Sequence, residues 1–504
     1  MVLALYVLEL SAVLVALALY KRGARPPLVF LAAPAGRVVL VAVPAIAASA
    51  LVIVHQLRRS VPGRASFAAT LTLNLLSVLL MFCTAEGFVR VFATTTPAGP
   101  AFAGTLLFPR SWENVAARGR AILRKASAQG SFLVYDDQLG WTLGANRRSA
   151  DYNLAFVRQY LAERGRRLPD GNAAQEQWSG FDGPDDNIYL SSVEGIRSPR
   201  VGMSFATIPA KRRIALVGDS FTFGLEVRYE ETWGHQLELA LGPEFQVLNF
   251  GVDGYGVDQA YLRYRRDVVS WHPDIVILGV IDDDLRRTMC VYGFMCFPRS
   301  EIPFPKPRFV VRGDTLVLLN VPLATPDSLF TKKAIAELPF IEHEGSFDPV
   351  VWERHSYHAA YSIRFLLSRY RRWYVPGPTV TDEALRDVNG HLLRAFVRSA
   401  HEHDSAPIVV YFPSGVDFVP DPGRPPSVAQ DVLERNGIPY LDMTDCVSRV
   451  RPTERFGRLH YSAATNAAVA KCLRDWITVG ILRQVRGRRP RPSHDQNDTN
   501  ALRE

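Results

Sequence analysis

One serine stands where polypeptides commonly present a nucleophile. Ser220 lies in the turn Gly218–Gly224, which follows the short apolar run Ile214–Val217 and precedes the amphipathic stretch Thr232–Leu241. This order of strand, glycine-containing turn and helix places a hydroxyl at the carboxyl end of a parallel strand, where it can attack an electrophile once a base removes its proton. The alternative is an ordinary turn serine. The neighbouring Asp219 is expected to begin the helix rather than to catalyse.

Two other groups of side chains could bind metal. The run from Asp282 to Asp284 follows an apolar strand, and it suits either a solvated strand end or a hard cation, but no supporting ligand spacing accompanies it. Cys290 and Cys296 lack the partnering histidines of a zinc site. We therefore predict no metal and no cofactor.

The elements around Ser220 alternate between apolar strands and amphipathic helices. The expected strands are Ile214–Val217, Gln246–Gly251, Asp274–Ile281, Pro407–Pro413 and Ile438–Asp442, and the expected helices include Thr232–Leu241, Asp258–Val269, Val428–Asn436 and one that His460 opens and that runs through Trp476. Such alternation predicts an α/β fold with a doubly wound parallel sheet, in which the loops beyond the carboxyl ends of the strands form one crevice.

With these elements in order, residues 210–482 resemble the SGNH, or GDSL-type, hydrolases. The matching motifs are Gly218-Asp219-Ser220, the stretch Leu248–Gly256 and His460, with the upstream segments Tyr135–Trp141 and Gly195–Arg197 seen in membrane-anchored members. The resemblance implies an SGNH-hydrolase-like, flavodoxin-like three-layer fold. It also implies Ser220 as nucleophile, His460 as base, and the backbone N–H groups of Ser220 and Gly254 as donors to an oxyanion.

The third family motif departs from the pattern. Where the family has an asparagine, this chain has Asp282, or Asp283 if the register slips. A carboxamide would donate a hydrogen bond to a developing oxyanion, whereas an ionised carboxylate would repel it. Asp282 is therefore expected at the third oxyanion position, and only its protonated form could donate there.

The last motif departs as well. Three residues before His460 the family usually has an aspartate that orients the histidine, and this chain has Gly457. Asp445 and Glu454 are the nearby candidates for that role, whereas Asp442 is expected to end its strand. A backbone carbonyl can also orient the histidine of such a pair.

The first ninety or so residues are more apolar than the rest of the chain. Three apolar runs, Val2–Tyr20, Val38–Val54 and Phe67–Thr84, are each about long enough to cross a bilayer and leave almost no wet face. We expect three transmembrane helices that anchor the protein in a lipid bilayer. Lys-Arg-Gly-Ala-Arg after the first run argues against a cleavable signal peptide.

The loops after the first and second apolar runs carry equal positive charge, so charge does not predict which loop lies in the cytoplasm. Four cysteines fall into two plausible pairs, Cys290 with Cys296 and Cys446 with Cys472, which suits an oxidising compartment, with free buried thiols as the alternative. Three crossings with the Arg58-Arg59 loop inside would place the large domain outside the cytoplasm.

Net charge excludes a nucleic-acid partner. The chain carries +8 overall, of which residues 1–65 hold +6 and residues 483–504 hold +3, so that the globular part is close to −1. A protein that binds a polyanion through this part would need a basic face.

The predicted organisation is residues 1–93 as membrane helices, 94–209 as linker and extension, 210–482 as the hydrolase-like domain with an insertion at 297–405, and 483–504 as a basic tail. We predict a membrane-anchored serine esterase that acts on O-acyl or O-acetyl groups of an extracytoplasmic glycan, lipid or small ester. The alternatives are an O-acyltransferase that uses the same serine and a catalytically weakened glycan-binding or scaffold protein.

Overall fold

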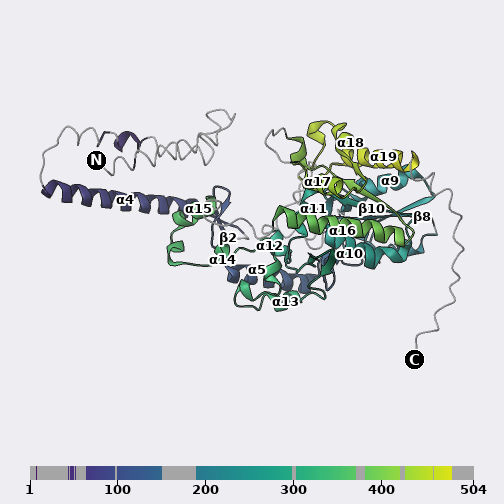
Figure 1. Cartoon of the computed structure of the whole chain (residues 1–504), viewed down its shortest axis with the longest axis horizontal. Coiled ribbons are helices and arrows are strands. Elements are labelled where there is room, and N and C mark those ends of the chain that lie inside the picture. The colour runs from purple at the N-terminus through teal and green to yellow at the C-terminus, as the bar shows by residue number, and fades with distance from the viewer. Residues whose placement is uncertain are drawn as a thin grey trace, which may run out of the picture. The chain divides into compact units, whose positions relative to one another are not determined.

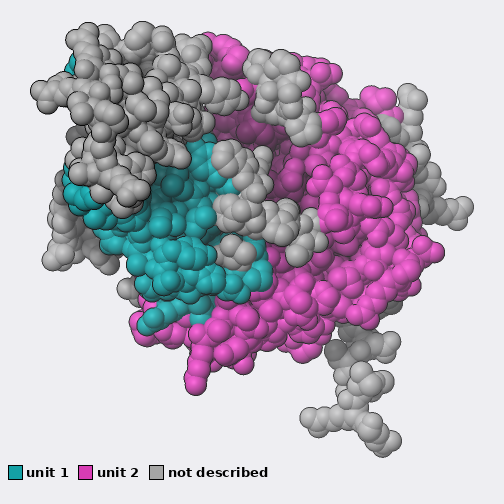
Figure 2. Space-filling model, turned by 60° about the vertical axis from the view of Figure 1, so that its left-hand side comes forward, with its two compact units in different colours: residues 1–115, 348–377 teal, residues 116–347, 378–504 magenta. Residues whose placement is uncertain are grey.

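The chain divides into two compact units, which Figure 2 colours separately: Met1–Val115 with Asp348–Gly377, and Ala116–Phe347 with Pro378–Glu504. The computed structural model describes residues 64–96, 99–149, 189–209, 211–297, 302–370, 381–419, 426–457 and 459–479, together with a few residues before 53. The strands and motifs predicted to carry chemistry all fall in the second unit.

A five-stranded parallel sheet forms the centre of the second unit (Figure 1). Its strands are β8 (Arg212–Val217), β9 (Phe245–Asn249), β10 (Ile275–Val280), β13 (Ala406–Tyr411) and β14 (Tyr440–Asp442), in the spatial order β14-β13-β10-β8-β9. Every pairing between them is parallel. This is the flavodoxin-like order. The second strand, β9, lies on one side of β8, and the later strands β10, β13 and β14 are added on its other side. The predicted strands and the predicted α/β fold with a parallel sheet are confirmed.

Helices cover both faces of this sheet and bury its apolar residues. One face carries α10 (Val257–Arg263), α16 (Asp382–Glu402) and α17 (Val428–Arg435), and the other carries α9 (Trp233–Leu241), α18 (Thr444–Ser448) and α19 (Ala463–Val479). Figure 1 shows α9, α18 and α19 on one side of β8 and β10, with α10 and α16 on the other. Strands buried on both faces explain why their sequences read as continuous apolar runs.

In the described part of the second unit, small antiparallel hairpins and the helix α5 lie outside the central sheet and the helices that cover it. The hairpins are β4 (Leu133–Asp136) with β5 (Gly140–Leu143), β6 (Leu190–Ser191) with β7 (Arg197–Ser198), and β11 (Phe309–Arg312) with β12 (Thr315–Leu318). The last of these turns at Gly313-Asp314. The helix is α5 (Trp112–Gln129).

The insertion at 297–405 is shared between the two units. Its part from Asp348 to Gly377 belongs to the first unit. This part contains α14 (Pro349–Trp352), a 3₁₀ turn and α15 (Tyr361–Arg369). Glu86 of α4 (Arg64–Phe92) accepts hydrogen bonds from the backbone N–H groups of Tyr361 and Ser362. The predicted linker after residue 93 instead forms a small antiparallel sheet of β1 (Thr94–Thr96), β2 (Gly99–Phe102) and β3 (Thr105–Leu106).

The apolar run Phe67–Thr84 lies within α4, so the prediction of a helix there is confirmed. In the described part of the chain, however, no helix combines the length and apolarity needed to cross a membrane. The prediction of three transmembrane helices is therefore not confirmed. Most of the two earlier runs and all of the predicted tail 483–504 lie outside the described residues.

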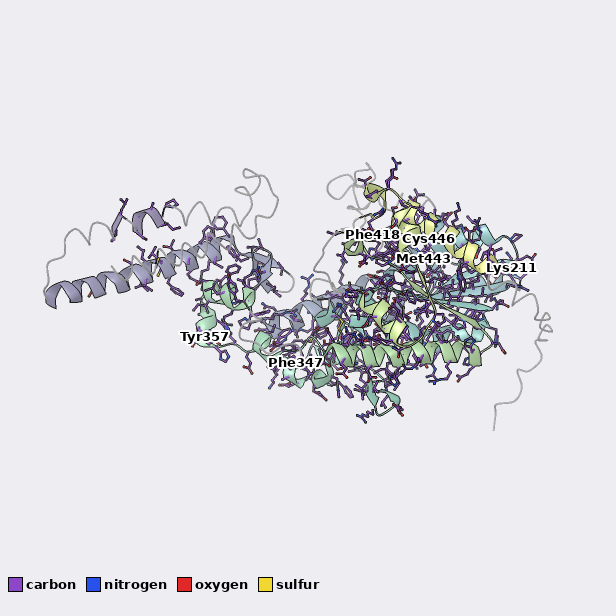
Figure 3. The ribbon with its side chains drawn as sticks, turned by 45° about the horizontal axis from the view of Figure 1, so that its top comes forward. Lys211, Phe347, Tyr357, Phe418, Met443 and Cys446 are labelled. Atoms are coloured by element: carbon purple, nitrogen blue, oxygen red, sulfur yellow. A yellow bond between two sulfur atoms is a disulfide. The ribbon has the colours of Figure 1, made fainter. Side chains whose placement is uncertain are left out.

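Both predicted cysteine pairs form disulfides, Cys290–Cys296 and Cys446–Cys472. Met443 and Cys446, labelled in Figure 3, belong to the apolar cluster between the sheet and α19. The second disulfide therefore fastens α18 to α19, the helix that follows His460.

Candidate active site

The turn that carries Ser220 is shaped by the glycine before it. Gly218 has φ 151°, and a Cβ placed on it would lie 2.3 Å from Thr222 Oγ1 and 2.7 Å from the Gly279 carbonyl oxygen. Only glycine fits this close approach between β8 and β10. Asp219 then caps the short helix α8 (Ser220–Phe223), where its carboxylate accepts from the backbone N–H of Phe221 at 2.8 Å.

The structure brings Ser220 and His460 together. The distance from Ser220 Oγ to His460 Nε2 is 2.9 Å, although the two residues lie 240 positions apart. Ser220 Oγ also lies 3.2 Å from Asp219 Oδ2. That carboxylate is already occupied by the Phe221 N–H and by Arg287, so the histidine is the better proton acceptor.

A glutamate that the sequence analysis missed completes the arrangement. Glu226 Oε1 lies 3.0 Å from His460 Nδ1, and the same carboxylate accepts the backbone N–H groups of Leu459 and His460. Its side chain is only 8% exposed. An ionised carboxylate can only accept, so His460 Nδ1 carries the proton and Nε2 offers its lone pair to the hydroxyl of Ser220.

The predicted orienting acids lie elsewhere. Asp445 is in the first turn of α18, and the Glu454 carboxylate pairs with Arg451 at 2.8 Å. A Cβ on Gly457 would lie 2.7 Å from Glu226 Oε2, so the carboxylate of Glu226 fills the space where a side chain at 457 would stand. The missing aspartate is thus replaced by an acid from the other end of the domain.

Glu226 adopts a backbone conformation that costs free energy. Its φ of 71° lies in the left-handed region, which costs a residue with a side chain roughly 1–2 kcal/mol. Its N–H donates to the Tyr189 hydroxyl at 2.8 Å, and Arg197 donates to the next carbonyl, Val227, at 2.9 Å. The buried guanidinium of Arg197 also lies against the rings of Tyr189 and Phe223. The motif Gly195–Arg197 therefore fixes the segment that carries the acid.

Burial and hydrogen bonding act in opposite directions on Glu226. Burial raises the pKa of its carboxyl, but the hydrogen bond and charge of His460 and the two backbone donors outweigh burial, so the pKa lies below its ordinary 4.5. The bond to His460 therefore stabilises the fold fully above about pH 4.5 and is lost as the pH falls through the lowered value.

The turn at Gly254, the predicted oxyanion donor, is held to the nucleophile turn. Val252 N–H donates to the Gly218 carbonyl at 3.1 Å, and Trp141 Nε1 donates to the Asp253 carbonyl at 2.9 Å. Gly254 itself has φ 76°, a conformation that favours glycine. The upstream segment Tyr135–Trp141 thus positions this turn, as Gly195–Arg197 positions the acid.

Asp282, the predicted third oxyanion ligand, is bound to the start of another helix. Its Oδ1 accepts from Ser427 Oγ at 2.5 Å and from the Ala429 N–H at 3.0 Å, at the start of α17. Asp283 is exposed. These contacts do not support a third oxyanion ligand at Asp282, because the first aspartate of the run reaches a neighbouring helix.

The third aspartate of the run joins a buried charge network. Arg287 Nη1 donates to Asp284 Oδ1 at 2.6 Å, to Asp219 Oδ2 at 3.1 Å and to the Tyr255 carbonyl at 2.9 Å. Burial and the nearby Asp219 charge raise the pKa of Asp284 well above its usual value. One guanidinium thus connects the turns that carry Ser220 and Gly254.

The arrangement can activate a serine hydroxyl for attack on an electrophilic carbon or phosphorus. Within the described ranges, no group of three or more His, Cys, Asp or Glu side chains is placed to hold a metal ion.

Comparison with known proteins gives distant likenesses. No protein-family model matches the chain, and no curated protein matches it. Among solved structures, a lipase/acylhydrolase from Enterococcus faecalis is 14% identical, with 53% of this chain and 96% of that chain covered and a TM-score of 0.27. A catalytic mutant of an acetylxylan esterase from Geobacillus stearothermophilus is 14% identical over 54% of this chain and 96% of its own, with a TM-score of 0.29. A carbohydrate acetylesterase from Sinorhizobium meliloti is 14% identical over 53% and 99%, with a TM-score of 0.27. Likeness at this level assigns no activity to the chain.

The position of Asp282 gives a first prediction. Asp282→Asn should leave the reactivity of Ser220 unchanged, because residue 282 caps α17. It should lower the free energy of unfolding by less than about 1 kcal/mol, since an amide still accepts but no longer carries charge at a helix start. Urea unfolding and the rate of labelling by a fluorophosphonate measure the two effects. A labelling rate that rises tenfold or more would return Asp282 to the oxyanion site.

The contact between Glu226 and His460 gives a second prediction. Glu226→Gln should slow fluorophosphonate labelling of Ser220 by on the order of 10³-fold, because an amide no longer stabilises the charged imidazole that forms during attack. Gly457→Asp should also slow labelling, since the new carboxylate would displace Glu226.

The matched control is Glu230→Gln, an exposed acid in the same segment, which should label at the normal rate. Faster labelling of the Gly457→Asp variant would show that a family-type aspartate, rather than Glu226, is the competent acid.

Proposed function

We propose that the protein is a serine esterase of the SGNH/GDSL type that removes O-acyl groups. The observation that carries this proposal is the continuous path of hydrogen bonds from Ser220 Oγ through His460 to the buried carboxylate of Glu226. The flavodoxin-like strand order supports it. Ser220 follows β8, the Gly254 turn follows β9 and His460 comes after the last strand, β14, which is the order that the family resemblance implies.

The reaction begins when Ser220 Oγ attacks the ester carbonyl carbon and its proton passes to His460 Nε2. The backbone N–H groups of Ser220 and Gly254 receive the carbonyl oxygen as it becomes negative, and Glu226 stabilises the imidazolium. The C–O bond to the alcohol then breaks, and His460 returns the proton to the departing oxygen. Water attacks the acyl-serine in the same way, which releases the carboxylic acid and regenerates Ser220.

Hydrolysis of an activated acetate ester by the purified full chain tests this proposal. We expect turnover that Ser220→Ala and His460→Ala each reduce by on the order of 10⁴-fold or more. Mass mapping after a fluorophosphonate reaction should place the label on Ser220. A folded protein that neither turns over the ester nor labels, beside an active control esterase, would favour the glycan-binding alternative. Acyl transfer to an added sugar in preference to water would favour the acyltransferase.

We further propose that residues 1–93 attach the protein to a lipid bilayer and that the esterase unit lies outside the cytoplasm. Three apolar runs in the sequence support the attachment, as do the exposed apolar side chains that α4 carries, among them Leu76, Leu79, Leu80, Phe82 and Val91. Two disulfides support an oxidising compartment. An acylated envelope glycan or lipid is the substrate class that fits this location.

Topology reporters test the location. A reporter fused after residue 504 should behave as exported, and one inserted after Arg59 should behave as cytoplasmic. The reverse pattern, or recovery of the full chain in the fraction that lacks membranes, would overturn the proposal without affecting the esterase assignment.

A further inference from the structure

Two apolar side chains stand against the turn at Gly254. A Cβ placed on Gly254 would lie 3.3 Å from Ile302 Cδ1 and 3.4 Å from the Cε2 and Cζ atoms of Phe297. Both side chains therefore border the space that a side chain at Gly254 would occupy, on the turn whose N–H is proposed to receive the acyl carbonyl oxygen.

The segment that precedes Phe297 is closed by the disulfide Cys290–Cys296 and contains α12 (Gly293–Cys296). Phe297 N–H donates to the Gly293 carbonyl at 2.8 Å, and Gly293 N–H donates to the Phe304 carbonyl at 2.9 Å. Ile302 is buried directly against Gly293, where a Cβ would lie 2.5 Å from its Cγ2 atom. Both Phe297 and Ile302 are therefore held against Gly293.

The ring of Phe297 is also tied to the site by charge. The guanidinium carbon of Arg287 lies 5.2 Å from the centre of that ring, and the same guanidinium donates to the carbonyl of Tyr255, next to Gly254. A cation over an aromatic face is attractive and holds the ring in place. The ring, the turn and the nucleophile helix therefore share one cation.

We propose that Phe297 and Ile302 form the wall of the acyl pocket and restrict the enzyme to short acyl groups of about acetyl size. This inference rests on the proposed esterase function. The carbonyl oxygen must approach Gly254 N–H to about 3 Å, so the rest of the acyl group extends from a carbon only slightly farther away. An aromatic ring and a branched aliphatic side chain already occupy the adjoining space, and each extra methylene forced against such a packed wall is disfavoured.

The test compares acyl chain lengths. Second-order rate constants are measured for the p-nitrophenyl esters of acetate, butyrate and hexanoate with the purified full chain. We expect the native protein to prefer acetate to hexanoate by tenfold or more. Phe297→Ala and Ile302→Ala should each raise the hexanoate-to-acetate ratio by about tenfold, because the wall is cut back while Ser220, His460 and Glu226 remain.

Phe294→Ala is the matched control. It removes an aromatic ring from the disulfide-closed loop that precedes Phe297, but that ring packs on Tyr292 and Phe330. Its hexanoate-to-acetate ratio should match that of the native protein. If Phe297→Ala does not fold, Phe297→Leu gives the same readout with less loss of apolar contact.

The results distinguish failure of the short-acyl inference from failure of the esterase proposal. A native protein that hydrolyses hexanoate as readily as acetate, or a ratio that Phe297→Ala and Ile302→Ala leave unchanged, overturns the short-acyl inference and leaves the esterase in place. A folded protein that hydrolyses none of the three esters overturns the esterase proposal, and the inference with it.

Discussion

The hydrogen bond between Glu226 and His460 is the contact on which the candidate site depends. Without an acid at Nδ1, the imidazole has no partner that fixes its tautomer, and its Nε2 atom is not committed to accept the proton of Ser220. The acid comes from a residue with left-handed backbone geometry, three positions after the short helix of the nucleophile. Glu226 also accepts two backbone N–H groups from the loop before His460, so the same carboxylate shapes the loop and orients the ring.

The segments that precede the sheet explain how this geometry is maintained. Arg197 and Tyr189 bond to the backbone on either side of Glu226, and Trp141 bonds to the backbone beside Gly254. Each of these side chains is buried. The two upstream motifs therefore act as supports for the acid and for the oxyanion turn, and the sheet with its helices would not hold the site in this form without them.

Local patterns explain which parts of the structure could be predicted. Apolar runs such as Ile214–Val217 and Asp274–Ile281 identify buried strands because both faces are covered, and Gly218-Asp219-Ser220 identifies the nucleophile turn because its neighbours in sequence are its neighbours in space. Glu226 could not be found in this way. Its partner is 234 residues distant, and a glutamate at positive φ has no sequence signature. The roles of the aspartates after β10 could not be distinguished for a related reason. They are adjacent in sequence, and only the folded structure shows that Asp282 caps α17 while Asp284 binds Arg287.

The most direct test of the proposed site of Ser220, His460 and Glu226 is a crystal structure of the protein after reaction with a fluorophosphonate. We expect phosphorus bonded to Ser220 Oγ and the phosphoryl oxygen within hydrogen-bond distance of the backbone nitrogens of Ser220 and Gly254. We also expect the Glu226 carboxylate to remain on His460 Nδ1. An adduct on another residue, a phosphoryl oxygen turned away from Gly254, or an acid other than Glu226 on His460 would contradict the proposed site.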